Sequence, residues 1–167
     1  MCISIHKIRS NQLQQGISLI EVLVSIVILA IALLSLAALH ISTLRNNYNA
    51  EYNSVAAIQI QNIIERMQAN PAGVAAGSYN NITLSSSASD SSCTSTCSPS
   101  QVAQHDAYQW NSQNIRLLPA GQGTVSASGD TFTVTIRWDA NRTGATGMGC
   151  SGNPNVDLAC ARASVEL

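Results

Sequence analysis

The stretch from Gln14 to His40, "QQGISLIEVLVSIVILAIALLSLAALH", decides the fold of this chain. From Val22 to Leu44 there is no Asp, Glu, Lys or Arg over 23 residues. A helix of that length is about 34 Å long, and a bilayer's hydrocarbon core is about 30 Å thick. We therefore expect one membrane-spanning helix. Glu21 is the unusual residue near its start, because a carboxylate in lipid costs free energy unless it is paired.

The same helix is expected to continue far beyond the apolar run, from Ser18 to about Ala69. No Gly or Pro falls between Ile17 and Asn70, where Asn70-Pro71 gives a strong stop. The second half of this segment is amphipathic, which predicts that a folded domain packs against it. The apolar stripe at helical spacing consists of Leu44, Tyr48, Tyr52, Val55, Ile60, Ile63, Ile64 and Met67.

The remaining residues predict a small domain of mixed structure. Residues 105–119, "HDAYQWNSQNIRLLP", predict a short helix anchored by Tyr108, Trp110, Ile115 and Leu118. Residues 123–139 predict a β-hairpin, because apolar and polar residues alternate from Phe132 to Trp138 and "SGD" supplies a turn. The ending "ARASVEL" predicts a last strand. The expected fold class is α+β, a long N-terminal α-helix packed on a small antiparallel β-sheet.

Flanking charges predict the orientation of the span. Lys7 and Arg9 precede it, while Arg45 follows it close to Glu51. Cationic flanks stay on the cytoplasmic side, so the C-terminal domain is expected outside the cytoplasm, in the periplasm.

The cysteines agree with an oxidising compartment. The chain has five, and Cys2 lies in the N-terminal segment. The other four allow three pairings, of which the local ones, Cys93–Cys97 and Cys150–Cys160, are the most economical. The sequence leaves a cross-pairing open.

Glu21 has no Lys or Arg partner within the span. Residues 1–16 resemble a targeting segment, and cleavage after Gly16 creates a new α-amino group on Ile17. Such an amine has a pKa of about 7.7–8.0, and it lies one helical turn from Glu21. Between neighbouring chains, this pair would fix the axial register of packed helices.

These residues resemble the N-terminal signal of type IV prepilins and type II secretion pseudopilins. The features that carry the resemblance are Gly16, the cleavage point before Ile17, Glu21 and the unbroken apolar run. "LRNNYNAEYNSVAAIQIQNIIERMQANPAG", "YQW", "LLPAGQGTV" and "FTVTIRWD" resemble PilV-type minor pilins in particular. Two departures are Ile17, where the family usually has Phe, and the lack of a proline in the span. The second, together with the low aromatic content of 4%, favours a minor subunit or a pseudopilin over a major pilin.

The resemblance implies a division into four segments. Residues 1–16 form a leader cleaved by a prepilin peptidase, which also methylates Ile17. Residues 17–44 form the half of the helix that crosses the inner membrane and enters the pilus core, 45–70 form its amphipathic half, and 71–167 form a periplasmic β-rich domain. The implied partners are other minor and major pilins, with a tip adhesin as a further candidate. Glu21 would dock subunits together.

The resulting hypothesis is a minor type IV pilin that primes pilus assembly and takes part in pilus-linked adhesion or motility. One alternative is a minor pseudopilin of a type II secretion system. An alternative of a different class is a single-pass, signal-anchored periplasmic sensor or binding domain.

Other chemistry receives little support from the sequence. His105-Asp106 follows Cys93 and Cys97, but this spacing is not typical of zinc sites, so we expect no metal and no cofactor. No nucleophile, phosphate-loop or paired-carboxylate motif predicts an enzyme, and Asp139 is expected to start a turn. With a net charge of −1, we expect no nucleic-acid partner, although Arg116, Arg137, Arg142 and Arg162 offer a weakly basic set.

Overall fold

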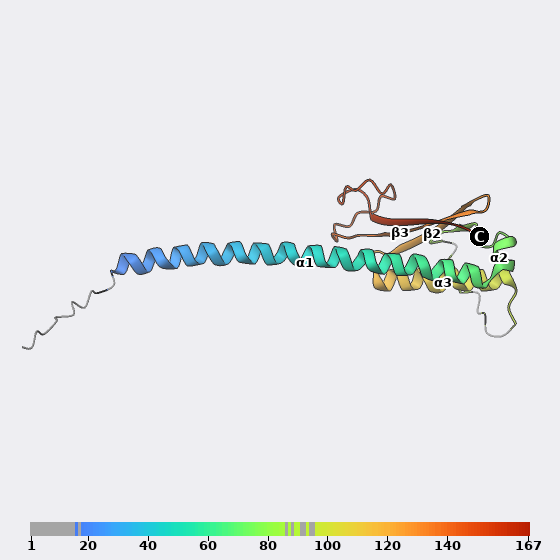
Figure 1. Ribbon diagram of the computed structural model, residues 1–167, viewed down its shortest axis with the longest axis horizontal. Coiled ribbons are helices and arrows are strands. Elements are labelled where there is room, and N and C mark those ends of the chain that lie inside the picture. Colours follow the sequence, from blue (N-terminus) through green and yellow to red (C-terminus); the bar gives the residue numbers. More distant parts are fainter. Residues whose placement is uncertain (1–15, 17, 86, 88, 91–92, 94–95) are drawn as a thin grey trace, which may run out of the picture. The chain divides into compact units, whose positions relative to one another are not determined.

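The computed structural model describes residues 16, 18–85, 87, 89–90, 93 and 96–167. Ile17 and the expected leader other than Gly16 lie outside the described residues. The elements in chain order are α1 (Leu19–Ala69), α2 (Pro71–Ala75), β1 (Asn81–Ile82), α3 (Pro99–Leu117), β2 (Gln122–Ser128), β3 (Thr131–Trp138) and β4 (Ala159–Glu166) (Figure 1).

The long helix α1 is confirmed and has 51 residues. It ends at Ala69, after which the Asn70 side chain accepts a hydrogen bond from Gly73 N at the start of α2. The chain divides into two compact units between Leu44 and Arg45. Within the second unit, burial of α1 begins at Ala56.

The predicted apolar stripe is therefore only partly a packing face. Leu44 and Tyr48 are each 54% exposed, which corrects the expectation that they pack on the domain. The buried residues of α1 are Ala56, Gln59, Ile60, Ile63, Ile64 and Met67.

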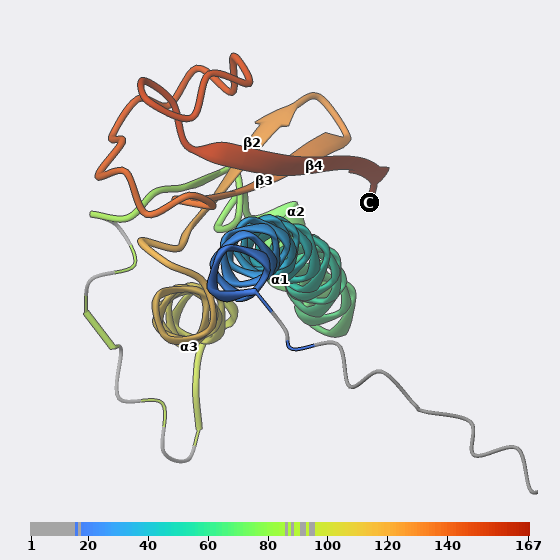
Figure 2. The same ribbon diagram turned by 90° about the vertical axis from the view of Figure 1, so that its left-hand side faces the viewer.

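The sheet is antiparallel with strand order β1-β2-β3-β4. The predicted hairpin is β2 and β3, with Val125 opposite Val134 and a turn at Gly129, whose φ of 61° favours glycine. On β3, Phe132, Val134, Ile136 and Trp138 are buried, as the alternation predicts. The predicted last strand is β4, which pairs along the whole length of β3. Helix α3 and the second half of α1 cover one face of this sheet (Figure 2).

Helix α3 begins earlier than the sequence analysis expected, at Pro99 instead of His105. Ser98 caps it: Gln101 N donates to Ser98 Oγ and Ser98 N donates to Gln101 Oε1, a reciprocal pair that satisfies two backbone donors. Of the expected anchors, Trp110 and Leu118 are buried, but Ile115 is 60% exposed. The expectation for Ile115 is wrong because another face of α3 packs inward. That face carries Ala103, Asp106, Ala107, Trp110, Asn111 and Asn114.

A buried polar network joins α1 to α3. Arg66 Nη1 lies 2.9 Å from Asp106 Oδ1, and Tyr79 OH donates to Asp106 Oδ2 at 2.7 Å. Asn70 Nδ2 donates to Tyr79 OH at 3.1 Å. Burial, followed by the hydrogen bond to Asp106, raises the pKa of Tyr79 above its usual value. The network therefore ties the end of α1 to the middle of α3 and stabilises the neutral phenol.

Candidate functional site

Gly16 lies just before α1, and Glu21 lies in its first turn; the sequence singles out both residues. Gly16 is exposed, and a side-chain carbon built on it would meet no atom within 4 Å. Glu21 N donates to Ser18 O at 2.9 Å, which places its carboxylate in the first turn, where the helix dipole favours a negative charge. Among the described residues, no cation forms an ion pair with Glu21.

The apolar surface that follows is uncovered. All described residues from Ser18 to Leu44 are exposed, and the exposed fraction ranges from 45% at Val22 to 77% at Leu19 among the large apolar side chains. In the described part of the chain, α1 is the one helix long and apolar enough to cross a membrane. An apolar surface of this extent requires lipid or other protein around it.

Three hydroxyl side chains within the run are hydrogen-bonded to the backbone of the helix itself. Ser25 Oγ donates to Glu21 O at 2.7 Å, and Ser35 and Thr43 make the same bond to the carbonyl four residues earlier, each at 3.0 Å. These hydroxyls therefore need no partner in an apolar environment. The Glu21 carboxylate differs, because it accepts nothing from the described residues of its own helix.

Glu21 shares a face of α1 with Ser25 and Leu29, beside Val22 and Ile26. These residues, which include the small Ser25, line an open hollow on the helix surface. Small residues allow helices to approach closely, so a second helix on this face would come near Glu21.

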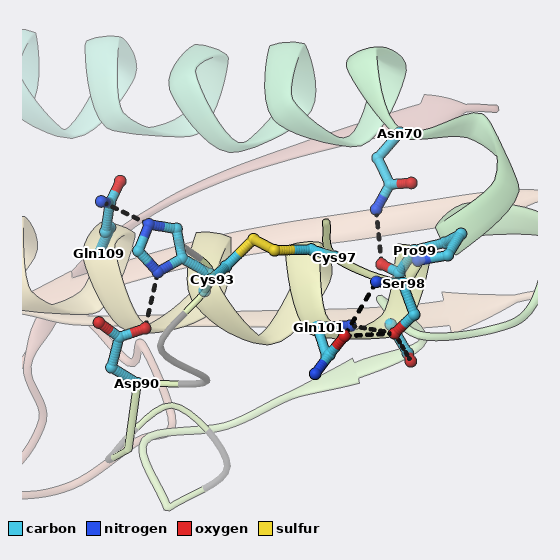
Figure 3. The surroundings of a disulfide bond; sticks show 10 residues. Asn70, Asp90, Cys93, Cys97, Ser98, Pro99, Gln101 and Gln109 are labelled. Carbon is cyan, nitrogen blue, oxygen red and sulfur yellow. Dashed lines mark hydrogen bonds and ion pairs between the residues drawn. A yellow bond between two sulfur atoms is a disulfide. The ribbon is translucent and has the colours of Figure 1, made fainter. Parts of the chain in front are cut away.

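Two disulfides lie in the second unit. Cys93 and Cys97 are bonded, with Cα atoms 5.8 Å apart, just before the start of α3 (Figure 3). Cys150 and Cys160 are bonded with Cα atoms 5.7 Å apart and join the β3–β4 connection to β4. Each bond closes a short loop, and neither joins the two loops together.

His105 is hydrogen-bonded to Gln109 and Asp90. Gln109 Nε2 lies 2.7 Å from His105 Nε2, and His105 Nδ1 lies 2.6 Å from Asp90 Oδ1 (Figure 3). Because an amide nitrogen only donates, Nε2 accepts and Nδ1 donates to Asp90. Within the described ranges, no group of three His, Cys, Asp or Glu side chains is placed to hold a metal ion.

Asp139, Arg137 and Arg162 make structural hydrogen bonds. The Asp139 carboxylate accepts from Thr143 N at 3.0 Å and Gly144 N at 2.7 Å, so it starts a turn as expected. Arg137 donates to Thr124 Oγ1 and Arg162 donates to Thr135 Oγ1 across neighbouring strands. Burial, and then the charge of Arg162, lowers the pKa of Arg137.

Comparison with known proteins gives one match, at the N-terminus. Residues 11–37 match the prokaryotic N-terminal methylation motif, a range that contains Gly16, Ile17 and Glu21. No curated protein and no solved structure matches the chain significantly. The motif supports a place in the type IV prepilin-like superfamily, and the long helix on an antiparallel sheet is a type IV pilin-like layout. The motif also implies processing by a prepilin peptidase and assembly with other pilin-like subunits.

Proposed function

We propose that this chain is a minor type IV pilin of the PilV type, a structural subunit that helps to prime pilus assembly and serves pilus-linked adhesion or motility. The observation that carries the proposal is the methylation motif at residues 11–37, followed without interruption by an uncovered apolar helix. The PilV-type assignment rests on the resemblance of "LRNNYNAEYNSVAAIQIQNIIERMQANPAG", "YQW", "LLPAGQGTV" and "FTVTIRWD".

Processing creates the docking chemistry in this proposal. Cleavage after Gly16 removes the leader, and the amine of Ile17 receives a methyl group and keeps its positive charge. The amine of one mature chain then pairs with the Glu21 carboxylate of a neighbour. Glu21 is exposed in the first turn of α1 with no cation beside it in the described residues, as a docking acceptor requires. In apolar surroundings, loss of either partner leaves an uncompensated charge.

The rest of the chain forms the exposed body of the subunit. Residues 17–44 anchor the protein in the inner membrane and later pack in the pilus core, with 45–70 leading into the periplasmic domain of 71–167. The two local disulfides form in that oxidising compartment and hold the loops beside α3 and β4. The domain would meet other minor and major pilins and, at the end of the filament, a tip adhesin.

Processing is tested first. The full chain is produced with and without a prepilin peptidase, and the N-terminus is determined by intact-mass measurement and N-terminal sequencing. The expected product begins at Ile17 and carries one methyl group, only when the peptidase is present. A bulky residue in Gly16→Leu should block cleavage, while Gln15→Ala should not. An unprocessed wild-type chain would refute the pilin assignment and favour the signal-anchored alternative.

Docking is tested with Glu21→Ala, and Glu65→Ala is the control at an exposed position of the same helix. Breaking a buried ion pair costs about 3–5 kcal/mol, so incorporation into sheared surface pili should fall by at least about a hundredfold. Both variants should remain in the membrane fraction at wild-type levels. Normal incorporation of Glu21→Ala would contradict the docking role. Processed protein that never reaches surface pili but supports protein secretion would favour the pseudopilin alternative.

A further inference from the structure

A cleft of about 700 Å³ lies within the second unit, between the first turns of α1 after the apolar run and the β3–β4 connection. Arg45, Tyr48, Asn49 and Tyr52 line it from α1, and Asn141 and Arg142 line it from the connection. The two sides touch where Arg142 Nη2 donates to Tyr52 OH at 3.4 Å. Nothing in the pilin assignment uses this cleft.

Arg142 is held in the cleft by an uncommon backbone conformation. Its φ is 53°, in the left-handed region that residues with a side chain rarely adopt. Asp139 enforces the turn: its carbonyl accepts from Arg142 N, and its carboxylate accepts from the amides of Thr143 and Gly144. Backbone strain of this kind concentrates at functional positions, so the conformation points to a role for the Arg142 side chain.

The lining of the cleft favours an anion with an organic part. Arg45 and Arg142 contribute two positive charges, and no Asp or Glu belongs to the described residues that line it. The rings of Tyr48 and Tyr52 stack with centroids 6.5 Å apart and offer an apolar wall. The amides of Asn49 and Asn141 supply hydrogen bonds for neutral hydroxyl groups. Guanidinium groups bind phosphate oxygens in a bidentate manner, which makes a phosphate ester a good fit.

The position of Arg45 in the sequence favours a membrane lipid as the source of such a phosphate ester. Arg45 directly follows Leu44, the last residue of the apolar run. When residues 22–44 span the hydrocarbon, Arg45 lies at the level of the lipid headgroups, and Tyr48 lies one turn further out. Tyrosine is favoured at both membrane interfaces, and the long arginine side chain can bury its apolar stem while its guanidinium reaches the headgroups.

We propose that the cleft binds the headgroup of an anionic phospholipid, with its phosphate between Arg45 and Arg142 and the polar group esterified to that phosphate against Tyr48 and Tyr52. The bound lipid holds the folded domain at the outer surface of the inner membrane before assembly. The proposal requires membrane insertion of the span but is independent of cleavage, methylation and docking through Glu21.

The test uses the full chain purified in an uncharged detergent. Short-chain phosphatidylglycerol, short-chain phosphatidylcholine and inorganic phosphate are titrated separately, and binding is measured by thermophoresis and by lipid retention in native mass spectrometry. Phosphatidylglycerol should bind at least about tenfold more tightly than the other two. Loss of a charge-assisted hydrogen bond should weaken its binding about tenfold in both Arg142→Gln and Arg45→Gln. Arg116→Gln, at an exposed position outside the cleft, is the matched control and should change nothing.

The two arginine variants should unfold at the same temperature as the wild type, because both side chains are exposed. Arg45→Gln does not depend on the strained turn, so it decides the question if Arg142→Gln destabilises the domain. Equal affinity for the two lipids, or equal losses in Arg45→Gln and Arg116→Gln, would overturn the proposal. Inorganic phosphate that binds as tightly as phosphatidylglycerol would also overturn it, since the cleft would then be a site for a free anion.

Discussion

Replacing Asp106 with alanine removes the central acceptor of the network that joins α1 to α3. Asp106 is 8% exposed and accepts hydrogen bonds from Arg66 at 2.9 Å and from Tyr79 at 2.7 Å. Asp106→Ala leaves the Tyr79 hydroxyl buried with Asn70 as its donor but with no acceptor for its own proton. It also removes the only carboxylate that pairs with Arg66 in the described part of the chain.

The expected cost follows from these two losses. A buried donor without an acceptor costs about 1–3 kcal/mol. The Arg66 contribution is smaller, about 1 kcal/mol, because its side chain is 23% exposed and keeps Asn62 and Gln109 as acceptors. Together they predict that Asp106→Ala lowers the free energy of unfolding by about 2–4 kcal/mol.

Tryptophan fluorescence during urea unfolding measures this change. The chain's two tryptophans, Trp110 and Trp138, are both buried in the second unit, so the signal reports that unit and not the apolar span. The full chain in detergent is compared with Asp106→Ala and with the exposed control Glu65→Gln, which should stay within about 0.5 kcal/mol of wild type. Two results would refute the coupling of Asp106 to Tyr79. One is a loss of unfolding free energy below 1 kcal/mol for Asp106→Ala, and the other is that Asp106→Ala costs as much in a Tyr79→Phe background as in the wild type.

Three further predictions use the same unfolding assay. The pKa of Tyr79 is raised in the folded state, so its contribution to stability is present below about pH 10 and is lost as the pH rises further. Tyr79→Phe should therefore make the free energy of unfolding less dependent on pH above about pH 10. An unchanged slope of stability against pH in that range would contradict this. Gly123→Ala places a methyl group against the Trp110 ring and should cost about 1–3 kcal/mol, with a change below 0.5 kcal/mol as the contrary result. Ser98→Ala removes the cap of α3 and should lower the free energy of unfolding by about 1 kcal/mol. The control Ser126→Ala, at an exposed strand position, should cost less. Equal losses in the two variants would argue against the cap.

Local patterns predicted the long helix and the hairpin because each depends on neighbours in the sequence. The length of α1 follows from the lack of Gly and Pro, and β3 follows from alternation between Phe132 and Trp138. The start of α3 was also encoded locally, in Ser98-Pro99 with Gln101 three residues after Ser98, but this capping signal lay within a serine-rich stretch and was missed.

The buried face of α3 could not be predicted from apolar spacing. Asn111 occupies a core position because its side chain acts like a strand neighbour: Gly123 N donates to Asn111 Oδ1 at 2.7 Å, and Asn111 Nδ2 donates to Gly123 O at 3.1 Å. This polar pairing puts Asn111 inward, while Ile115 is exposed. A periodicity that counts only apolar residues selects the wrong face here.

The N-terminal motif and the cleft also differ in whether their residues are close in the sequence. Gly16 and Glu21 are close in the sequence, so their motif is recognisable without the structure. The cleft depends on the approach of Tyr52 and Arg142, which are 90 residues apart. Only the tertiary structure brings them together.

The internal hydrogen bonds of Ser25, Ser35 and Thr43 have a consequence for movement of the helix between environments. Because these three hydroxyls and the helical backbone are bonded internally, none of those bonds breaks when the helix leaves lipid for the interior of a filament. Lipid tails and the side chains of neighbouring helices are similarly apolar, so the exchange of surroundings along the middle of the span is close to neutral in free energy. In the proposed subunit, extraction from the membrane and return to it would then be controlled by polar contacts at the two ends of the span, near Glu21 and near Arg45. Such an anchor is suited to repeated, reversible use.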